Sequence, residues 1–305
     1  MKKILSLIIV LTVVISAFVG CGNTAPAEKD YTLSVGVVVS ENLAGAKLVE
    51  TVASVVTDAD GKIVLCRVDS LTYAVKYNED GTLNTTAPTS NAALGDNYGS
   101  MPAGTWADQG AALEKYVVGK TQAEVAAIAL EGGKATDSDL VAGCSINISD
   151  LLKAIDNAFK SAHKVSFKST ATDFTAGLSV VGAVKDKADD TSKNAQYTAT
   201  FSTAVLAEGK VVAAIFDTAE ADLKGITDNG AASVSFAGTK REQGDSYAMT
   251  SGAWYVQADA YAQSAIGKTA SDIATLATEG VAGCTMPYST FDFKAGLEAA
   301  VKSAR

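Results

Sequence analysis

The feature that most constrains the fold is an internal repeat, because five short motifs occur twice in this chain of 305 residues. Three pairs are 148 positions apart: Asp60-Gly61-Lys62 and Glu208-Gly209-Lys210, Trp106 and Trp254, and Gly119-Lys120-Thr121 and Gly267-Lys268-Thr269. A fourth pair, Gly95-Asp96 and Gly244-Asp245, is 149 apart. An Ala-Gly-Cys-Ser/Thr tetrad recurs after only 140 positions, since the first copy carries eight extra residues near "EGGKATDS". Recurrence at a fixed spacing predicts two structural units of one kind.

The repeat predicts two homologous domains, residues 31–163 and 164–305. In each copy a segment rich in Val and Thr meets an Asp-Gly or Glu-Gly turn and returns, which is typical of a β-hairpin. Helical patterns follow over residues 106–118 and 122–130, and over 254–266 and 270–277 in the second copy. A closing amphipathic helix is expected from about Ser149 or Ser289. We therefore expect an α+β fold in which each domain packs helices on a small antiparallel sheet and buries its own core.

The N-terminus has the features of an export signal. Lys2 and Lys3 precede an uncharged apolar run over residues 4–19 that is short and closely followed by small residues, which favours a secretory signal over a stop-transfer helix. The sequence "FVGC" is similar to a bacterial lipobox, in which Cys21 would carry the lipid anchor. A plain signal peptide or an uncleaved anchor helix is the alternative. We expect a leader (1–20), a tether (21–30) and an extracytoplasmic, lipid-anchored protein at the cell membrane.

Charge and composition exclude several classes of protein. The net charge of −9 becomes −11 without the leader, which contains two lysines and no acids, so a nucleic-acid binder is not expected. The cysteines that remain, Cys66, Cys144 and Cys284, are odd in number and widely spaced, so we expect unpaired thiols and no zinc site. With His163 as the only histidine, no nucleophile–base–orienter set can be assembled, and no catalytic or metal-binding residue is predicted.

The two tetrads combine a flexible backbone with a hydroxyl shortly before a helix. Gly143 and Gly283 allow a close approach of the backbone, and Ser145 and Thr285 follow two positions later. Free N–H groups and the helix dipole at a helix N-terminus stabilise a phosphate. We therefore expect both hydroxyls in accessible turns at the rim of a groove, beside free backbone N–H groups.

The segments around the tetrads resemble a motif of the FMN-binding domain family of bacterial extracytoplasmic redox proteins. That motif begins with an acidic residue and two variable positions, continues with Ser/Thr-Gly-Ala, and ends with a Thr or Ser. A flavin transferase esterifies this last residue to the FMN phosphate. The matching residues are Asp139, Gly143, Cys144 and Ser145 in the first copy and Glu279, Gly283, Cys284 and Thr285 in the second. Both copies have Ala for Ser/Thr and Cys for Ala, and the second has Glu for Asp. The similarity extends to the closing helix and the Gly-Lys hairpin.

The resemblance implies a flavin carrier rather than an enzyme that converts a substrate. Covalent FMN on each copy would receive electrons from a membrane donor and pass them to outside acceptors. If one site alone is filled, the family's acid at Asp139 favours Ser145. Trp106, Trp254, Tyr98 and Tyr247 are placed in equivalent positions and either stack near the flavin or belong to the core. The alternative is a cofactor-free lipoprotein that binds a small ligand or a partner protein, with an extracytoplasmic hydrolase a distant third.

Overall fold

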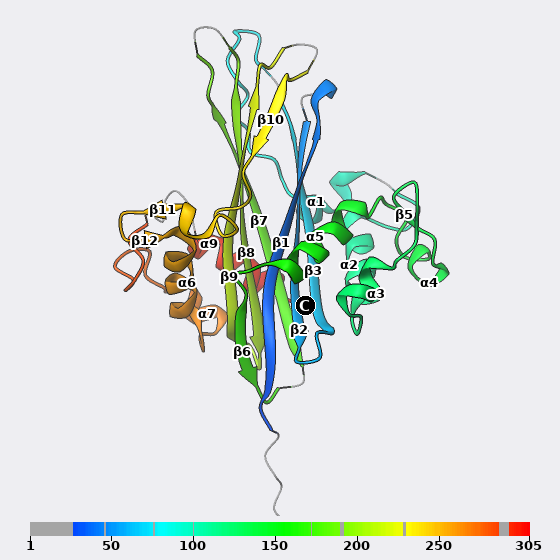
Figure 1. Ribbon diagram of the computed structural model, residues 1–305, viewed down its shortest axis with the longest axis vertical. Helices are drawn as coiled ribbons and strands as arrows, with labels where there is room; N and C mark the ends of the chain where they lie inside the picture. Colours follow the sequence, from blue (N-terminus) through cyan, green and yellow to red (C-terminus); the bar gives the residue numbers. More distant parts are fainter. Residues whose placement is uncertain are drawn as a thin grey trace, which may run out of the picture.

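The computed structural model describes residues 27–45, 47–75, 77–99, 101–171, 173–189, 192–227, 230–286 and 293–305. Within them the chain is a mixed α+β protein whose sheets are antiparallel (Figure 1). The expected leader, the lipid-anchor residue Cys21, most of the tether and Ser289 lie outside the described residues.

Two four-stranded sheets form the centre of the molecule, in the orders β3-β2-β1-β6 and β10-β9-β8-β7. The strands of the first are β1 (Lys29–Asn42), β2 (Lys47–Asp58), β3 (Ile63–Ala74) and β6 (Val165–Ser169). Those of the second are β7 (Phe174–Asp186), β8 (Ala195–Ala207), β9 (Lys210–Lys224) and β10 (Ser233–Phe236). The hairpins at Gly61 and Gly209 are those that the sequence predicts, and each has a register shift close to its turn, at Val56/Thr57 and Val205/Leu206.

The two sheets face each other and share an apolar core, in addition to the core that each half buries between its own sheet and helices. Inward-facing residues of the first sheet, such as Leu33 and Val52, form one cluster with Phe201 and Ile215 of the second. Alternate side chains of a strand point to opposite faces, so each sheet has an inner and an outer apolar face. The inner faces cover each other. Ser54 and Thr203, at equivalent positions of the two halves, meet there with their hydroxyl oxygens 2.7 Å apart.

Helices cover the outer faces, so the layers run helix, sheet, sheet, helix (Figure 1). On the first sheet lie α1 (Asn91–Leu94), α2 (Trp106–Val117), α3 (Gln122–Ala126), α4 (Ser138–Val141) and α5 (Ser149–Lys160). On the second lie α6 (Trp254–Ala265), α7 (Ala270–Ile273) and α9 (Phe293–Ser303). One-turn 3₁₀ segments occupy Leu43–Gly45, Gly95–Tyr98 and Gly244–Ser246.

Thr121 and Thr269 begin α3 and α7 with capping boxes, in which each threonine and the acid three residues later exchange hydrogen bonds. Both helices are shorter than the sequence pattern predicts. In the first half the reason is that residues 130–135 form a small hairpin, β4 (Leu130–Glu131) and β5 (Lys134–Ala135). This hairpin contains most of the eight extra residues of the first copy. In the second half a comparable two-stranded hairpin, β11 (Ala248–Met249) and β12 (Gly252–Ala253), stands before α6 instead.

Strand β6 crosses the boundary that the sequence predicts. The repeat places residues from 164 onward in the second unit, but Val165–Ser169 pairs with β1, from Leu33 opposite Val165 to Lys29 opposite Ser169. The first sheet is therefore completed by the start of the second half. The reason is that the chain leaves α5 beside the open edge of β1, whose N–H and C=O groups need partners.

Candidate cofactor-attachment sites

The first tetrad is held by a buried glutamine from α2. The N–H and the hydroxyl of Ser145 both donate to Gln109 Oε1, at 2.7 and 3.1 Å, and the N–H of Ile146 donates to the same oxygen at 3.1 Å. Gln109 is fully buried. Its Nε2 donates to Gly104 O at 3.1 Å, so hydrogen bonds fix the amide at both ends.

The second tetrad repeats this geometry. The N–H and the hydroxyl of Thr285 donate to Gln257 Oε1 at 2.9 and 3.0 Å, and Gln257 Nε2 donates to Gly252 O at 3.2 Å. Gln257 is also fully buried, and it follows Gln109 by 148 positions. Sequence reasoning missed both glutamines. The available signal was the pattern Trp-x-x-Gln, which occurs at Trp106 and again at Trp254.

The other residues of each tetrad attach the turn to the core. Cys144 and Cys284 are 1% and 4% exposed and belong to the apolar clusters between sheet and helices. A Cβ on Gly143 would lie 2.9 Å from the Cβ of Ala112, and one on Gly283 would lie 3.0 Å from that of Ala260. Glycine therefore permits close packing at both tetrads, and Gly283 also adopts a positive φ of 80°. The cysteine points inward, and the Ser or Thr after it lies at the surface.

The expectation of free N–H groups beside the hydroxyl is wrong for the first tetrad. Ser145 lies four residues before the first residue of α5, and its own N–H and that of Ile146 are bonded to Gln109. Ser149 is the first helical residue rather than the cap, and its N–H donates to Asn147 Oδ1 at 3.0 Å. After the second tetrad, residues 287–292 are outside the described part of the chain.

The two acids of the motif lie apart from the hydroxyls. Asp139 is exposed in the short helix α4, where its N–H donates to Asp137 Oδ1 at 2.9 Å. Glu279 is exposed in a bend with no helix around it. Among the described hydrogen bonds, neither carboxylate contacts its tetrad.

The two hydroxyl-bearing residues differ in exposure. Thr285 is exposed, whereas Ser145 is half-buried. One reason is the β4–β5 hairpin, which lies against the turn after the first tetrad and accepts the N–H of Ile148 at Gly133 O (2.8 Å). The expected accessibility is thus present at the second tetrad and reduced at the first.

The duplicated tryptophans belong to the core. Trp106 is 5% exposed and Trp254 is fully buried, and each packs in the cluster between its sheet and its helices. Tyr98 is the more exposed aromatic, with its ring 6.5 Å from that of Trp106. Tyr247 is half-buried beneath Lys240, whose Nζ lies 5.0 Å from the ring centre. Only the tyrosines are positioned to contact a bound molecule.

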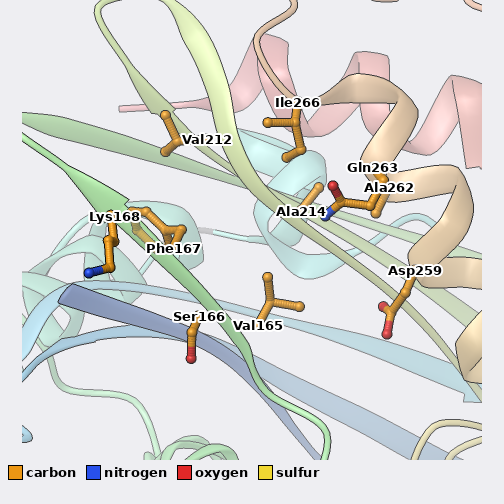
Figure 2. Close-up of a pocket in the computed structure, with 10 residues that line it drawn as sticks. All are labelled: Val165, Ser166, Phe167, Lys168, Val212, Ala214, Asp259, Ala262, Gln263 and Ile266. Carbon is orange, nitrogen blue, oxygen red and sulfur yellow. The ribbon is translucent and has the colours of Figure 1, made fainter.

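The cavities described here lie away from the tetrads. The largest of four, about 330 Å³, lies between β6 and α6 (Figure 2) and is lined by residues that include Phe167, Lys168 and Asp259. The others measure about 300, 280 and 260 Å³. Neither Ser145 nor Thr285 lines any of these four, so the expected groove beside the hydroxyls is not among them.

The expectation that these cysteines form no disulfide is confirmed, and Cys66, Cys144 and Cys284 are all buried. Burial raises the pKa of the Cys66 and Cys144 thiols, which makes them poor nucleophiles. Across the described residues, no three His, Cys, Asp or Glu side chains are grouped so that they could hold a metal ion. No helix in this part of the chain has the length and apolar character needed to span a membrane.

Comparison with known proteins gives no relative: no family model, curated protein or solved structure matches the chain.

Proposed function

We propose that the chain is a membrane-anchored extracytoplasmic flavin carrier that holds FMN in phosphoester linkage on Ser145 and Thr285. In this proposal the two halves are copies of one FMN-binding-like unit, Cys21 carries the lipid anchor, and a flavin transferase attaches the cofactor. The observation that carries the proposal is the matched geometry of the two hydroxyls, each held by a buried glutamine at 3.0–3.1 Å.

The matched geometry suits an acceptor for group transfer. Because each hydroxyl donates its proton to the glutamine oxygen, the lone pairs of Ser145 Oγ and Thr285 Oγ1 are left for an external phosphoryl group. The hydroxyl oxygen would attack the FMN phosphorus of a flavin dinucleotide held by the transferase. The pyrophosphate bond would break, the nucleoside monophosphate would leave, and the hydroxyl proton would be released, so the chain gains the mass of FMN less one water. The backbone N–H of each residue would keep its bond to Gln109 or Gln257, and the turn would keep its shape.

The surroundings of the tetrads are compatible with an attached flavin. Thr285 is exposed, and the adjoining residues Ala142, Ala282 and the two glycines are small. The bound flavin would supply the redox chemistry, while the polypeptide would supply tethering and orientation. Two flavins on one anchored chain would relay electrons from a membrane donor to acceptors outside the cell.

The proposal is tested by the intact mass of the protein after coexpression with a flavin transferase. We expect one or two additions of FMN less water, with Ser145→Ala and Thr285→Ala each removing one addition. Ser149→Ala and Thr278→Ala are matched controls, since both positions are exposed and lie close to a tetrad. They should leave the mass gain unchanged.

Exposure changes the expectation for partial labelling. The motif acid favours Ser145, but the more accessible hydroxyl is that of Thr285. We therefore expect Thr285 to be labelled at least as completely as Ser145. No mass gain with a transferase shown to be active on another substrate would refute the flavin carrier, and a cofactor-free binding lipoprotein would then be the better account.

A further inference from the structure

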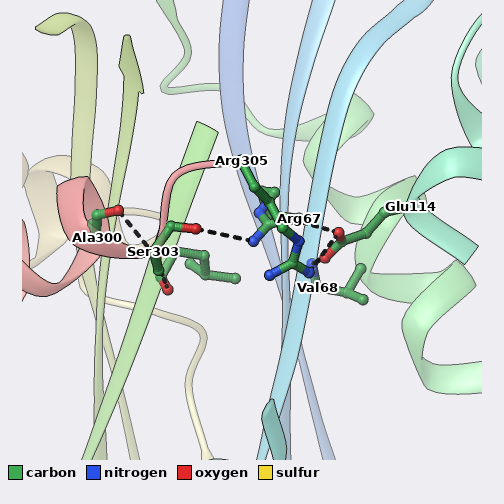
Figure 3. Close-up of polar contacts among 7 residues, drawn as sticks. Arg67, Val68, Glu114, Ala300, Ser303 and Arg305 are labelled. Carbon is green, nitrogen blue, oxygen red and sulfur yellow. Dashed lines mark hydrogen bonds and ion pairs between the residues drawn. The ribbon is translucent and has the colours of Figure 1, made fainter. Parts of the chain in front are cut away.

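Two of the three arginines of this acidic chain converge on one carboxylate. Arg67 Nη1 lies 2.6 Å from Glu114 Oε2, and Arg305 Nη2 lies 2.9 Å from the same oxygen (Figure 3). The other oxygen of Glu114 accepts the N–H of Val68 at 2.9 Å. Arg67 and Glu114 are each 6% exposed. One carboxylate thus faces two guanidinium groups, and the guanidinium of Arg67 is largely buried.

The guanidinium groups retain unused donors. Arg67 Nη2 makes only a long bond to Ser303 O, at 3.4 Å, and Arg67 Nε is buried without an acceptor among the described residues. Arg305 makes one described side-chain hydrogen bond, and its side chain is 51% exposed. A guanidinium has five N–H donors, and a buried donor without a partner is unfavourable.

A cavity of about 280 Å³ adjoins this pair, at the seam where β3, α1 and α2 of the first half meet β7 and α9 of the second. Besides the two arginines, hydroxyl-bearing residues line it: Ser90, Ser179 and Ser303. The one acid in the lining, Asp69, is occupied elsewhere, since its Oδ1 accepts the N–H groups of Ser70 and Ala92 at 2.8 and 2.9 Å. The hydroxyl of Ser303 already donates to Leu178 O and Ala300 O, at 3.2 and 3.0 Å, so the donors that the cavity offers come mainly from the guanidinium groups.

We propose that this seam cavity binds a small oxyanion, a carboxylate or a phosphate, between Arg67 and Arg305. Planar guanidinium groups bind these two anions through paired, charge-assisted hydrogen bonds. The anion would accept the unused N–H groups of the two guanidinium groups. Because the ligand would contact both halves, its binding would also strengthen their association. The proposal does not depend on flavin attachment, since none of these residues belongs to a tetrad.

The test measures the midpoint of thermal unfolding of the purified protein against increasing inorganic phosphate and, separately, succinate, with chloride at matched ionic strength. We expect saturable stabilisation by at least one oxyanion beyond that of chloride, and the comparison of the two series identifies which anion is bound. Arg305→Gln should weaken the apparent affinity by about tenfold or more, the effect of losing a charge-assisted hydrogen bond. Lys302→Gln is the matched control, because it removes the same charge from an exposed position on α9 that is not in the cavity lining.

Glu114→Gln separates anion binding from a purely structural ion pair. It should destabilise the protein without oxyanion, and it should increase the stabilisation by the oxyanion, because the competing carboxylate is gone. If neither oxyanion exceeds chloride, or if Arg305→Gln and Lys302→Gln respond alike, the site does not exist. A Glu114→Gln protein that gains no more from the oxyanion than the wild type would also overturn the proposal.

Discussion

Glu50 is a carboxyl group in the apolar core between the sheets. It lies on β2 with Leu48 and Val52, two residues away on either side, and all three are fully buried. Both oxygens of Glu50 lack a hydrogen-bond partner among the described residues. The nearby Tyr73 hydroxyl donates to Thr198 O at 2.8 Å instead. Burial raises the pKa of Glu50 to about 8, so the group is mainly protonated at neutral pH.

The raised pKa fixes the sign of the effect on stability. The folded state binds the proton more tightly than the unfolded state, so the contribution of Glu50 becomes less favourable as the pH rises from about 4.5 to about 8. In the unfolded chain Glu50 has a pKa of about 4.5 and is ionised at pH 7, so folding requires it to take up a proton at a pH about 2.5 units above that pKa. At about 1.4 kcal/mol per unit this uptake costs about 3 kcal/mol. Glu50→Gln has nearly the same size and does not ionise, so it removes this cost.

The assay is urea unfolding of the wild type and of Glu50→Gln at pH 4.5, 6, 7 and 8. We expect Glu50→Gln to increase the free energy of unfolding by about 3 kcal/mol at pH 7 and by almost nothing at pH 4.5. Asp69 and Asp217, whose pKa values burial raises to about 6, change both proteins alike and cancel in the difference. Glu41→Gln, at an exposed position of β1, is the control and should show no such gain.

A difference between the two proteins that is the same at every pH would refute the reasoning, since it would mean that Glu50 does not change its protonation on unfolding. A wild type that becomes more stable than Glu50→Gln as the pH rises would show that the sign is wrong. In that case an unrecognised partner would hold the ionised carboxylate.

Three further predictions follow from the contacts described. In the same urea titration, Glu114→Ala should lower the free energy of unfolding by about 3–5 kcal/mol, because it leaves Arg67 buried and unpaired. The control Asp156→Ala breaks a surface pair with Lys160 and should lower the free energy of unfolding by less than about 1 kcal/mol. Gln109→Leu should lower the free energy of unfolding by about 1–3 kcal/mol, because the N–H and hydroxyl of Ser145 lose their acceptor. It should reduce flavin labelling at Ser145 but not at Thr285, and an equal loss at both sites would contradict a local role. The buried thiols of Cys144 and Cys284 should react with a disulfide reagent only in urea, and fast reaction of the native protein would be inconsistent with the fold.

Features set by short-range sequence signals were predicted well. The hairpin turns at Gly61 and Gly209 depend on two or three adjacent residues, and the starts of α2 and α6 at Trp106 and Trp254 are as expected. The end of α3 was placed too late, because an apolar residue such as Leu130 fits a helix or a short strand equally well. Here the neighbouring Gly132 and Gly133 favour the hairpin.

Features that depend on distant residues were not predictable from the repeat alone. The motif placed Ser145 in a turn, but its hydrogen-bond acceptor, Gln109, is 36 residues away in α2. Each sheet likewise has two apolar faces. The alternation of residues along its strands indicates both faces but does not predict which element packs on each of them. The repeat therefore predicts the core of each half but not the third core, which the inner faces of the two sheets share.

The shared core also determines when the chain can fold during synthesis. The inner face of β1–β3 is complete once Ala74 has emerged, but the strand that finishes its cover, β9, ends at Lys224. At about 5–20 residues per second, these roughly 150 residues take on the order of 10 s to be made. During that interval the nascent first half presents a large apolar sheet surface, including Leu33 and Val52, to whatever surrounds it. A transiently exposed apolar face of this kind is prone to aggregation until the second half arrives.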